Sequence, residues 1–305
     1  MDYKRIFKTR KMRTKILRFL SFIPDRPMLK LQYWIKTGRR LDLKKPQRFT
    51  EKLQWYKLYY KNPLMIQCVD KYDVRDYVKS KGLKDILIPC YGVYDNVDSI
   101  DWNLLPNQFV IKDTLGGGGN KVIIIKDKES VNIDELCNKL RSWVSAKPAR
   151  KSGGREWPYY SGKNHRIIIE HFLSSNESEG GLIEYKFFCF DGKPEWLYVL
   201  ANREFGVSVE LGGYDDEFNK QDVIRNDERP LSKDIQKPTT FNQMKEIASQ
   251  LASGFPHARI DLYNENGQVR FGEITFFDGS GYMTYSPDTF DFTLGKNFLL
   301  KKYND

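Results

Sequence analysis

Residues 109–125 read FVIKDTLGGGGNKVIII, a glycine-rich loop between two short apolar runs. Apolar runs of this length that are bounded by glycine predict the two strands of a β-hairpin. Because glycine has no Cβ, the loop amides can approach a phosphate chain closely. Lys112, at the end of the first strand, can place an ammonium group on the same oxygens. The stretch predicts a clamp for a nucleotide triphosphate, whose loop residues are Gly116, Gly117, Gly118 and Gly119.

Two better-known phosphate-binding loops do not fit this stretch. The Walker loop needs Gly-Lys-Ser/Thr at the start of a helix, whereas Asn120-Lys121-Val122 has no hydroxyl to hold magnesium. The dinucleotide fingerprint needs a third glycine that begins a helix, but Val122 stands there and a strand follows. The remaining alternative is a flexible hairpin turn without a ligand, and the loop alone does not decide between turn and clamp.

The composition indicates a folded globular protein with room for one large or two modest domains. The chain has 305 residues, of which 40% are hydrophobic and 30% charged. No stretch approaches the about 20 apolar residues of a membrane-spanning helix. Arg18 interrupts the apolar stretch 16–24 and no cleavage site follows, which argues against a secretory signal. Four cysteines without paired spacing predict neither a disulfide framework nor a zinc site. We therefore expect a cytoplasmic protein.

The net charge of +10 is concentrated near the start of the chain, where residues 4–18 hold eight Lys or Arg. Apolar residues interleave with them at near-helical spacing. Such a helix could lie on an anionic membrane, peripheral at its inner face, or bind a lipid-linked glycan. The alternative is a solvated basic helix that caps the domain. No nucleic acid partner is expected, because no groove-reading or RNA-binding motif accompanies the charge.

Periodicity and capping signals predict an α+β protein with a helical N-terminal segment, residues 1–62. We expect helices at 50–60 with Thr50 as the cap, at 69–81, at 132–144 and at 241–254. We expect strands at 85–94, 166–170, 184–190 and 196–201. The basic, aromatic segment 146–165 suits a mobile loop over an anionic ligand, and a plain surface loop is the alternative.

Residues 258–281, ARIDLYNENGQVRFGEITFFDGSG, predict a second hairpin that turns at Asn266-Gly267. Alternation along the strands can bring Asp261 and Glu273 side by side. Two carboxylates on one sheet face repel unless a cation lies between them, and Mg²⁺ with phosphate oxygens is the natural occupant. Arg259 beside them could hold a transferring phosphoryl group. The alternative is that both acids face water and Arg259 pairs with one of them.

Five blocks of the chain, in order, resemble the ATP-grasp ligases, and in detail their TupA-like branch, found in bacterial surface-polysaccharide and teichuronopeptide gene clusters. The blocks are KPQRFTEKLQWYKLY (45–59), DKYDVRDYV (70–78), FVIKDTLGGGG (109–119), IIIEHFL (167–173) and ARIDLYNENGQVRFGEITF (258–276). The resemblance implies an α+β ATP-grasp fold in which two subdomains sandwich ATP. We expect the lid subdomain with its preceding region at 63–175 and the metal and substrate subdomain at 176–305.

The resemblance also implies roles for single residues. Lys71 and Lys112 match the two phosphate-binding lysines. The hinge that reads adenine through backbone groups matches Glu170, His171, Phe172 and Leu173. Glu184 stands where a carboxylate commonly holds the ribose hydroxyls, and Lys186 could reach the phosphates from the same strand. The alternative for Lys71 is an ordinary exposed lysine, and for Glu184 and Lys186 a charged strand edge.

In the second hairpin, Arg259 matches the substrate arginine, and Asp261 and Glu273 match the two metal-binding acids. Many family members continue Glu-x-Asn, whereas this chain has Glu273-Ile274-Thr275. A threonine hydroxyl is a poorer metal ligand than an amide oxygen, so the role of Thr275 stays open. His257 could move a proton, and a structural histidine is the alternative.

The function that the resemblance implies is an ATP- and Mg²⁺-dependent carboxylate–amine ligase that forms an amide through an acyl phosphate, with Arg259 and Lys112 as catalytic residues. The substrates would be a uronic acid of a surface glycan and an amino acid or other amine. One alternative is a glycosyltransferase, although Asp215-Asp216 and the pair Asp288 and Asp291 lack Asp-x-Asp spacing after an apolar strand. Another is a non-catalytic module that binds ATP or glycan.

Overall fold

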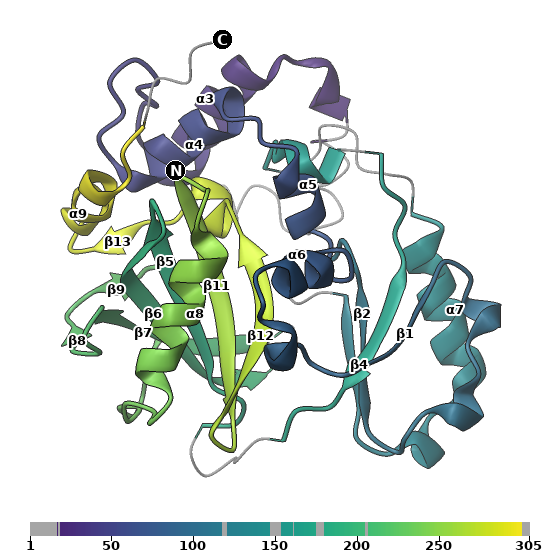
Figure 1. The fold of residues 1–305 in the computed structure, drawn as a ribbon. Helices are drawn as coiled ribbons and strands as arrows, with labels where there is room; N and C mark the ends of the chain where they lie inside the picture. Colours follow the sequence, from purple (N-terminus) through teal and green to yellow (C-terminus); the bar gives the residue numbers. More distant parts are fainter. Residues whose placement is uncertain are drawn as a thin grey trace.

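Two mainly antiparallel sheets, with helices packed on them, form most of the described part of the chain (Figure 1). The computed structural model describes residues 17, 19–117, 121–146, 154–160, 162–174, 180–204 and 207–300. The expected basic helix at 4–18 and the glycines Gly118 and Gly119 therefore lie outside the described residues, apart from position 17.

The smaller sheet has the strand order β1 (Cys90–Tyr94), β4 (Ile167–His171), β2 (Phe109–Asp113) and β3 (Val122–Ile125). The predicted hairpin is confirmed, because β2 pairs antiparallel with β3 and Lys112 lies opposite Val122. Helix α7 (Ile133–Val144) begins after Asn132, whose side chain accepts the Glu135 backbone N–H. Its buried face packs on β2 and β4 through Leu136, Leu140 and Trp143.

The larger sheet has seven strands, and its central members are long and buried on both faces. Helix α8 (Phe241–Ala252) covers one face, with Met244 and Leu251 fully buried. The second predicted hairpin is confirmed around Asn266-Gly267. The strand order is β10 (Arg229–Pro230), β7 (Ser208–Asp215), β6 (Lys193–Glu204), β5 (Glu184–Phe190), β11 (His257–Glu265) and β12 (Gln268–Thr275), and β8 (Lys220–Gln221) pairs with β7. A separate two-stranded ribbon joins β9 (Ile224–Arg225) to β13 (Tyr285–Ser286).

Helices α4 (Phe49–Tyr59), α5 (Leu64–Cys68) and α6 (Val74–Ser80), which precede β1, pack with the larger sheet. Phe49, Leu53 and Tyr56 share its hydrophobic core. Lys52 Nζ also donates to the carbonyl oxygens of Gly295 (2.6 Å) and Phe298 (2.8 Å) at the end of α9 (Phe290–Asn297). The helical segment before residue 63 therefore folds onto the C-terminal half of the chain. Helix α3 (Asp25–Thr37) packs on α4 in a separate cluster, through Leu29 and Tyr33.

Two expectations about helix starts are wrong. Thr50 does not cap α4, because the helix begins at Phe49 and the Thr50 hydroxyl donates to buried Asp291 (2.7 Å). The helix expected at 69–81 begins only at Val74. Before it, Asp70 Oδ1 accepts the backbone N–H groups of Tyr72 (2.9 Å) and Asp73 (3.0 Å), which holds a turn in place of a helix.

Strand β7 was not among the sequence expectations, because Gly212-Gly213 lies in its middle and glycine usually weakens a strand. Close packing explains both residues. A Cβ at Gly212 would lie 2.4 Å from Leu231, and one at Gly213 would lie 2.4 Å from Trp196. The strand expected at 85–94 is also shorter, since residues 84–86 form a 3₁₀ turn and β1 begins at Cys90.

Candidate active site

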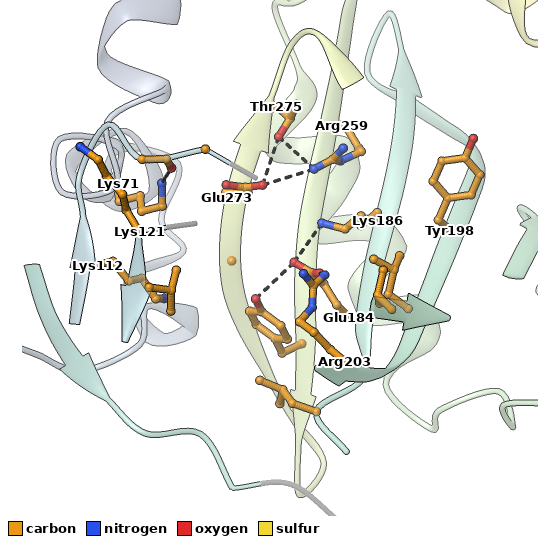
Figure 2. A pocket seen from close by; sticks show the side chains of 18 of the residues that line it. Lys71, Lys112, Lys121, Glu184, Lys186, Tyr198, Arg203, Arg259, Glu273 and Thr275 are labelled. Carbon is orange, nitrogen blue, oxygen red and sulfur yellow. Dashed lines mark hydrogen bonds and ion pairs between the residues drawn. The ribbon is translucent and has the colours of Figure 1, made fainter. Parts of the chain in front are cut away.

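A cleft of about 1260 Å³ lies between the two sheets and takes side chains from both. Figure 2 shows three lysines on the wall of the smaller sheet, Lys71, Lys112 and Lys121. The opposite wall, from β5, β6, β11 and β12, presents Glu184, Lys186, Arg203, Arg259, Glu273 and Thr275. The structure thus brings residues more than 200 positions apart, Lys71 and Thr275, to one cavity.

Lys112 projects from β2 into the cleft and is held from behind by Glu170 of β4. Its Nζ lies 2.7 Å from Glu170 Oε2. Glu170 is buried and its second oxygen lies 3.4 Å from Arg75 of α6. One carboxylate therefore orients the lysine, and Glu170 does not itself line the cleft.

Lys71 ties the turn before α6 to the glycine loop. Its backbone N–H donates to the Thr114 carbonyl (2.9 Å), and its Nζ donates to the Gly116 carbonyl. Burial lowers the pKa of Lys71, and the negative charge of Glu273 on the opposite wall counteracts this shift. The described part of the loop, Gly116 and Gly117, lines the cleft.

A third cation at this wall, Lys121, was not among the sequence candidates. Lys121 Nζ pairs with buried Asp113, whose oxygens also lie 2.8 Å from His165 Nδ1. Burial alone would raise the pKa of Asp113, but the hydrogen bonds from His165 and Lys121 hold it below its ordinary value. Asp113 thus fixes Lys121 at the start of β3, beside the glycine loop.

Three of the four residues expected at the hinge line the cleft, namely His171, Phe172 and Leu173. They follow one another where β4 ends. The His171 backbone N–H is already used by the Pro89 carbonyl (2.9 Å), and His171 Nδ1 lies 3.0 Å from the Tyr91 hydroxyl. Of the residues expected at the hinge, Phe172 and Leu173 therefore lie just beyond the regular pairing of β4.

On the opposite wall, Glu184 is a buried carboxylate with three partners. Lys186 Nζ lies 3.0 Å away, Arg203 lies 2.6 Å away, and the Tyr263 hydroxyl donates over 3.2 Å. Burial would raise the pKa of Glu184, but Lys186 and Arg203 outweigh it and lower the pKa. Glu184 is thus a fixed anion at the side of the cleft, with Arg203 and Tyr263 lining it as well.

Arg259 is the centre of the large-sheet wall. Its Nε and one terminal nitrogen donate to the two oxygens of Asp261, both at 2.7 Å, which is a bidentate pair. The other terminal nitrogen pairs with Asp278. Burial works against the charge of Arg259, but Asp261 and Asp278 raise its pKa above the ordinary value. The guanidinium is therefore a permanent, precisely oriented charge.

Asp261 and Glu273 face each other across the β11–β12 pair, as their spacing predicted. Their surroundings differ. Asp261 is fully buried and paired with both Arg259 and Lys186, and it does not line the cleft. Glu273 lines the cleft with 40% of its side chain exposed, and it accepts from Arg259 (3.3 Å) and from the Thr275 hydroxyl (3.4 Å).

The donor set at this wall fits Mg²⁺ through Glu273. Mg²⁺ is usually held by one or two carboxylates together with substrate phosphates and water. Glu273 offers carboxylate oxygen to the cleft, whereas both oxygens of Asp261 are occupied by Arg259 and Lys186. In the described part of the chain, no group of three or more His, Cys, Asp or Glu side chains could hold an ion without further ligands.

Asp278 and Arg225 extend the site in a direction that the sequence candidates did not include. Asp278 is buried, and Arg225 lies 3.4 Å from its second oxygen, so Asp278 joins Arg225 to Arg259. Burial would raise the pKa of Asp278, but the two arginines lower it. Asp278 lies three residues beyond the quoted Glu-x-Thr motif, and that proximity was the only signal in the sequence.

The described part of segment 146–165 is anchored at the cleft. Arg155 is buried and donates to the carbonyl oxygens of Leu20 and Ile23, both at 2.9 Å. Its neighbours Gly154 and Glu156 line the cleft, as does Tyr159. Residues 147–153 and 161, where mobility over a ligand was expected, lie outside the described residues.

A family model described as TupA-like ATP-grasp matches residues 51–299. The chain therefore belongs to the TupA-like ATP-grasp family, and its α+β architecture is the ATP-grasp fold. No curated protein matches the chain.

Among solved structures, the chain is similar to D-alanine–D-alanine ligase from Bacillus anthracis, at 18% identity over 69% of this chain and 57% of that one, with a TM-score of 0.41. It is similar to the D-alanine–D-alanine ligase from Helicobacter pylori, at 16% identity over 82% of this chain and 68% of that one, with a TM-score of 0.44. A third is N5-carboxyaminoimidazole synthetase from Staphylococcus aureus complexed with ADP, at 14% identity over 68% and 44%, with a TM-score of 0.37. The chain spans 57% of the length of the first of these.

Proposed function

We propose that this protein is an ATP- and Mg²⁺-dependent carboxylate–amine ligase. The observation that carries the proposal is the pairing of two walls across one cleft. Lys71, Lys112 and the Gly116 loop face Glu273 and Arg259 from the opposite sheet. Cations and loop amides on one side suit phosphate oxygens, and a carboxylate on the other side suits the metal that bridges them.

The reaction has two steps. In the first, a carboxylate oxygen of the substrate attacks the γ-phosphorus of ATP, so that an acyl phosphate forms and ADP leaves. In the second, an amine nitrogen attacks the acyl carbon, the C–O bond to phosphate breaks, and the proton of the amine passes to solvent. No protein nucleophile is needed. Mg²⁺, when bound, would neutralise charge on the phosphate oxygens.

The residues of the chain then divide the work. Lys112, oriented by Glu170, and Lys71 would hold the phosphates, and Arg259 would stabilise charge on the transferring phosphoryl group and the acyl oxygen. Phe172 and Leu173 would border adenine, and the Glu184 carboxylate would accept hydrogen bonds from the ribose hydroxyls. Because Asp261 and Asp278 hold Arg259 in place, no reorientation is needed during the reaction.

The substrate class is the finer part of the proposal. The family resemblance favours a uronic acid of a bacterial surface polysaccharide as the acid and an amino acid or other amine as the nucleophile. A glycosyltransferase is the less favoured alternative, because Asp215 accepts the backbone N–H groups of Glu217 and Asn219 in a turn outside the cleft. A non-catalytic ATP- or glycan-binding module would bind nucleotide without consuming it.

The experiment is to measure ADP release from ATP with candidate uronates and amino acids, each alone and in pairs. The ligase predicts ADP release that needs both substrates and Mg²⁺. Turnover of a sugar nucleotide without ATP would refute it in favour of a glycosyltransferase, and ATP binding without ADP release for any pair would favour the module.

Lys112→Ala tests the clamp separately from the substrates. ATP raises the unfolding temperature of any protein whose native state it binds. We expect this rise to disappear in Lys112→Ala, since the lysine is the ammonium group of β2 that faces the phosphates. Lys139→Ala, on the exposed face of α7, is the matched control and should retain the full rise. An unchanged rise in Lys112→Ala would mean that the clamp is misassigned.

A further inference from the structure

The net positive charge of this protein comes from one segment of the sequence. Residues 1–40 contain thirteen Lys or Arg and two acidic residues, which is a net charge of +11, whereas the whole chain has +10. The remaining 265 residues are therefore close to neutral. Such asymmetry indicates a partner with negative charge at this end of the molecule.

The same segment carries an exposed apolar surface. On α3, residues Leu31, Trp34 and Ile35 share one face at helical spacing and are exposed by 41%, 55% and 36%. The opposite face, which includes Met28, Leu29 and Tyr33, is buried, so α3 packs on the described part of the chain through that face and presents its outer face to the surface. Figure 1 shows α3 at the edge of the molecule, above α4.

The turn before α3 extends this surface. Phe19 precedes the 3₁₀ turn η1 (Leu20–Phe22) and Phe22 ends it. Their rings meet edge to face with centroids 6.3 Å apart, and the two residues are exposed by 77% and 74%. Five of the twelve exposed large hydrophobic side chains of the described residues thus fall between positions 19 and 35. The exposed cations Arg26 and Lys30 lie among them.

This surface is held in place and borders the cleft. Buried Arg155 donates to the carbonyl oxygens of Leu20 and Ile23 and pairs with Asp25 (2.8 Å), so η1 is fixed to the start of α3. Gly154 and Glu156, on either side of Arg155, line the cleft. Anything that docks on η1 and α3 is therefore close to the mouth of the candidate active site.

We propose that η1 and the outer face of α3, with the exposed cations Arg26 and Lys30, form an interfacial docking surface for a bilayer with anionic headgroups. Aromatic side chains that sit at the headgroup level, next to lysines and arginines, are typical of such surfaces. Each lysine or arginine near an anionic membrane surface strengthens binding to it. A second copy of the chain fits less well, because two segments of +11 would repel.

The test is co-sedimentation of the full chain with vesicles of phosphatidylcholine, with and without phosphatidylglycerol. We expect binding only to the anionic vesicles, and weaker binding at high salt. The double variant Phe22→Ser, Trp34→Ser should bind at least tenfold more weakly, and Lys30→Gln about fivefold more weakly, which is the equivalent of 1 kcal/mol.

The matched control variants carry the same kinds of substitution at exposed positions far from the proposed docking surface. Leu104→Ser removes a side chain that is 82% exposed beside the smaller sheet, and Lys139→Gln removes an exposed cation of α7 on the same side. Both variants should therefore bind vesicles like the unchanged protein. All variants should keep the unfolding temperature and its rise with ATP, which separates this test from that of the ligase.

Three outcomes would overturn the proposal. Equal binding by the double variant would mean that charge alone acts. Absence of binding to any vesicle, with retention of the protein by an acidic protein or by DNA, would assign the surface to that partner. Loss of a dimer in the double variant, measured by analytical ultracentrifugation, would assign it to a second copy.

Discussion

At the scale of single residues, the candidate site is organised by one guanidinium. Arg259 contacts Asp261, Asp278 and Glu273, and only Glu273 of these three has a large exposed part. A buried cation that holds two buried carboxylates leaves the third, exposed carboxylate free to take an external ligand. The two acids that the family motif treats alike therefore have different surroundings, and different consequences follow for their replacement.

Replacing Asp261 and Glu273 separately should reveal this difference. Asp261→Asn removes the buried carboxylate that Arg259 and Lys186 share, so that Arg259 keeps only Asp278 and Lys186 only Glu184 as buried counter-charges. Breaking such a buried pair costs about 3–5 kcal/mol of unfolding free energy. Glu273→Gln changes a side chain that is 40% exposed, so it should cost less than about 1 kcal/mol. It should instead abolish the effect of Mg²⁺ on ATP binding. Urea unfolding and calorimetric titration of ATP with and without Mg²⁺ measure both, and the reverse ranking would contradict this account.

The burial of His257 predicts that the unfolding free energy falls in acid. It lies away from the cleft among Phe49, Phe190 and Phe298, and burial lowers its pKa from 6.5 to about 4. Its Nδ1 donates to the Cys189 carbonyl (3.0 Å), so the neutral ring is the folded form. Above pH 6.5 both states are neutral and stability is complete; as the pH falls toward 4, the unfolded chain takes up the proton first.

The resulting loss is about 3 kcal/mol between pH 6.5 and pH 4. Carboxylates add their own dependence, so the unfolding free energy should be compared between the unchanged protein and His257→Phe at each pH. The ring of phenylalanine fits this aromatic cluster and does not titrate. A shallower pH dependence in the variant is expected, and equal slopes would show that His257 does not contribute.

At the scale of elements, the two hairpins are the parts that the sequence predicts best. Each is specified locally, by Gly116–Gly119 or Asn266-Gly267 between apolar runs, and short-range signals survive any tertiary arrangement. Strand β7 is not predicted from the sequence, because its two glycines are needed only for close packing against Leu231 and Trp196, which come from elsewhere in the chain. The start of α6 was misplaced because Asp70 turns the chain through its side chain, which competes with the helix.

The glycine loop allows a matched pair of substitutions. A Cβ at Gly116 would lie 3.0 Å from Lys121 Cβ and 3.2 Å from the Asp113 carbonyl, whereas one at Gly117 would meet nothing within 4 Å. Gly116→Ala should therefore displace the start of β3 and the carbonyl that Lys71 contacts, and weaken ATP binding by tenfold or more. Gly117→Ala should bind ATP nearly normally. Calorimetric titration measures both, and equal affinities would mean that the loop backbone does not set the phosphate site.

At the scale of the whole molecule, the sequence predicts a site with two walls, but it does not predict all the side chains that complete those walls. The resemblance predicts site roles for Lys71, Lys112, Glu184 and Glu273, and the side chains of all four line the cleft. Lys121, Arg203 and Asp278 were missed because their roles depend on partners, Asp113, Glu184 and Arg259, that meet them only after folding. Among the described residues, no helix is long and apolar enough to cross a bilayer.

A nucleotide that touches both walls should couple the two sheets. Amide hydrogen exchange of the full chain with ATP and Mg²⁺ should therefore slow in β2 and β3 and, at the same time, in β11 and β12, because opening of either wall then requires loss of the ligand.

In Glu273→Gln the contact with the metal is removed at one wall only. We expect protection in β2 and β3 to remain in part while protection in β11 and β12 falls to the nucleotide-free level. ATP without Mg²⁺ is the control and should give the same pattern in the unchanged protein. Protection confined to one sheet in the presence of Mg²⁺ would show that ATP binds to a single wall and that the cleft is not a sandwich.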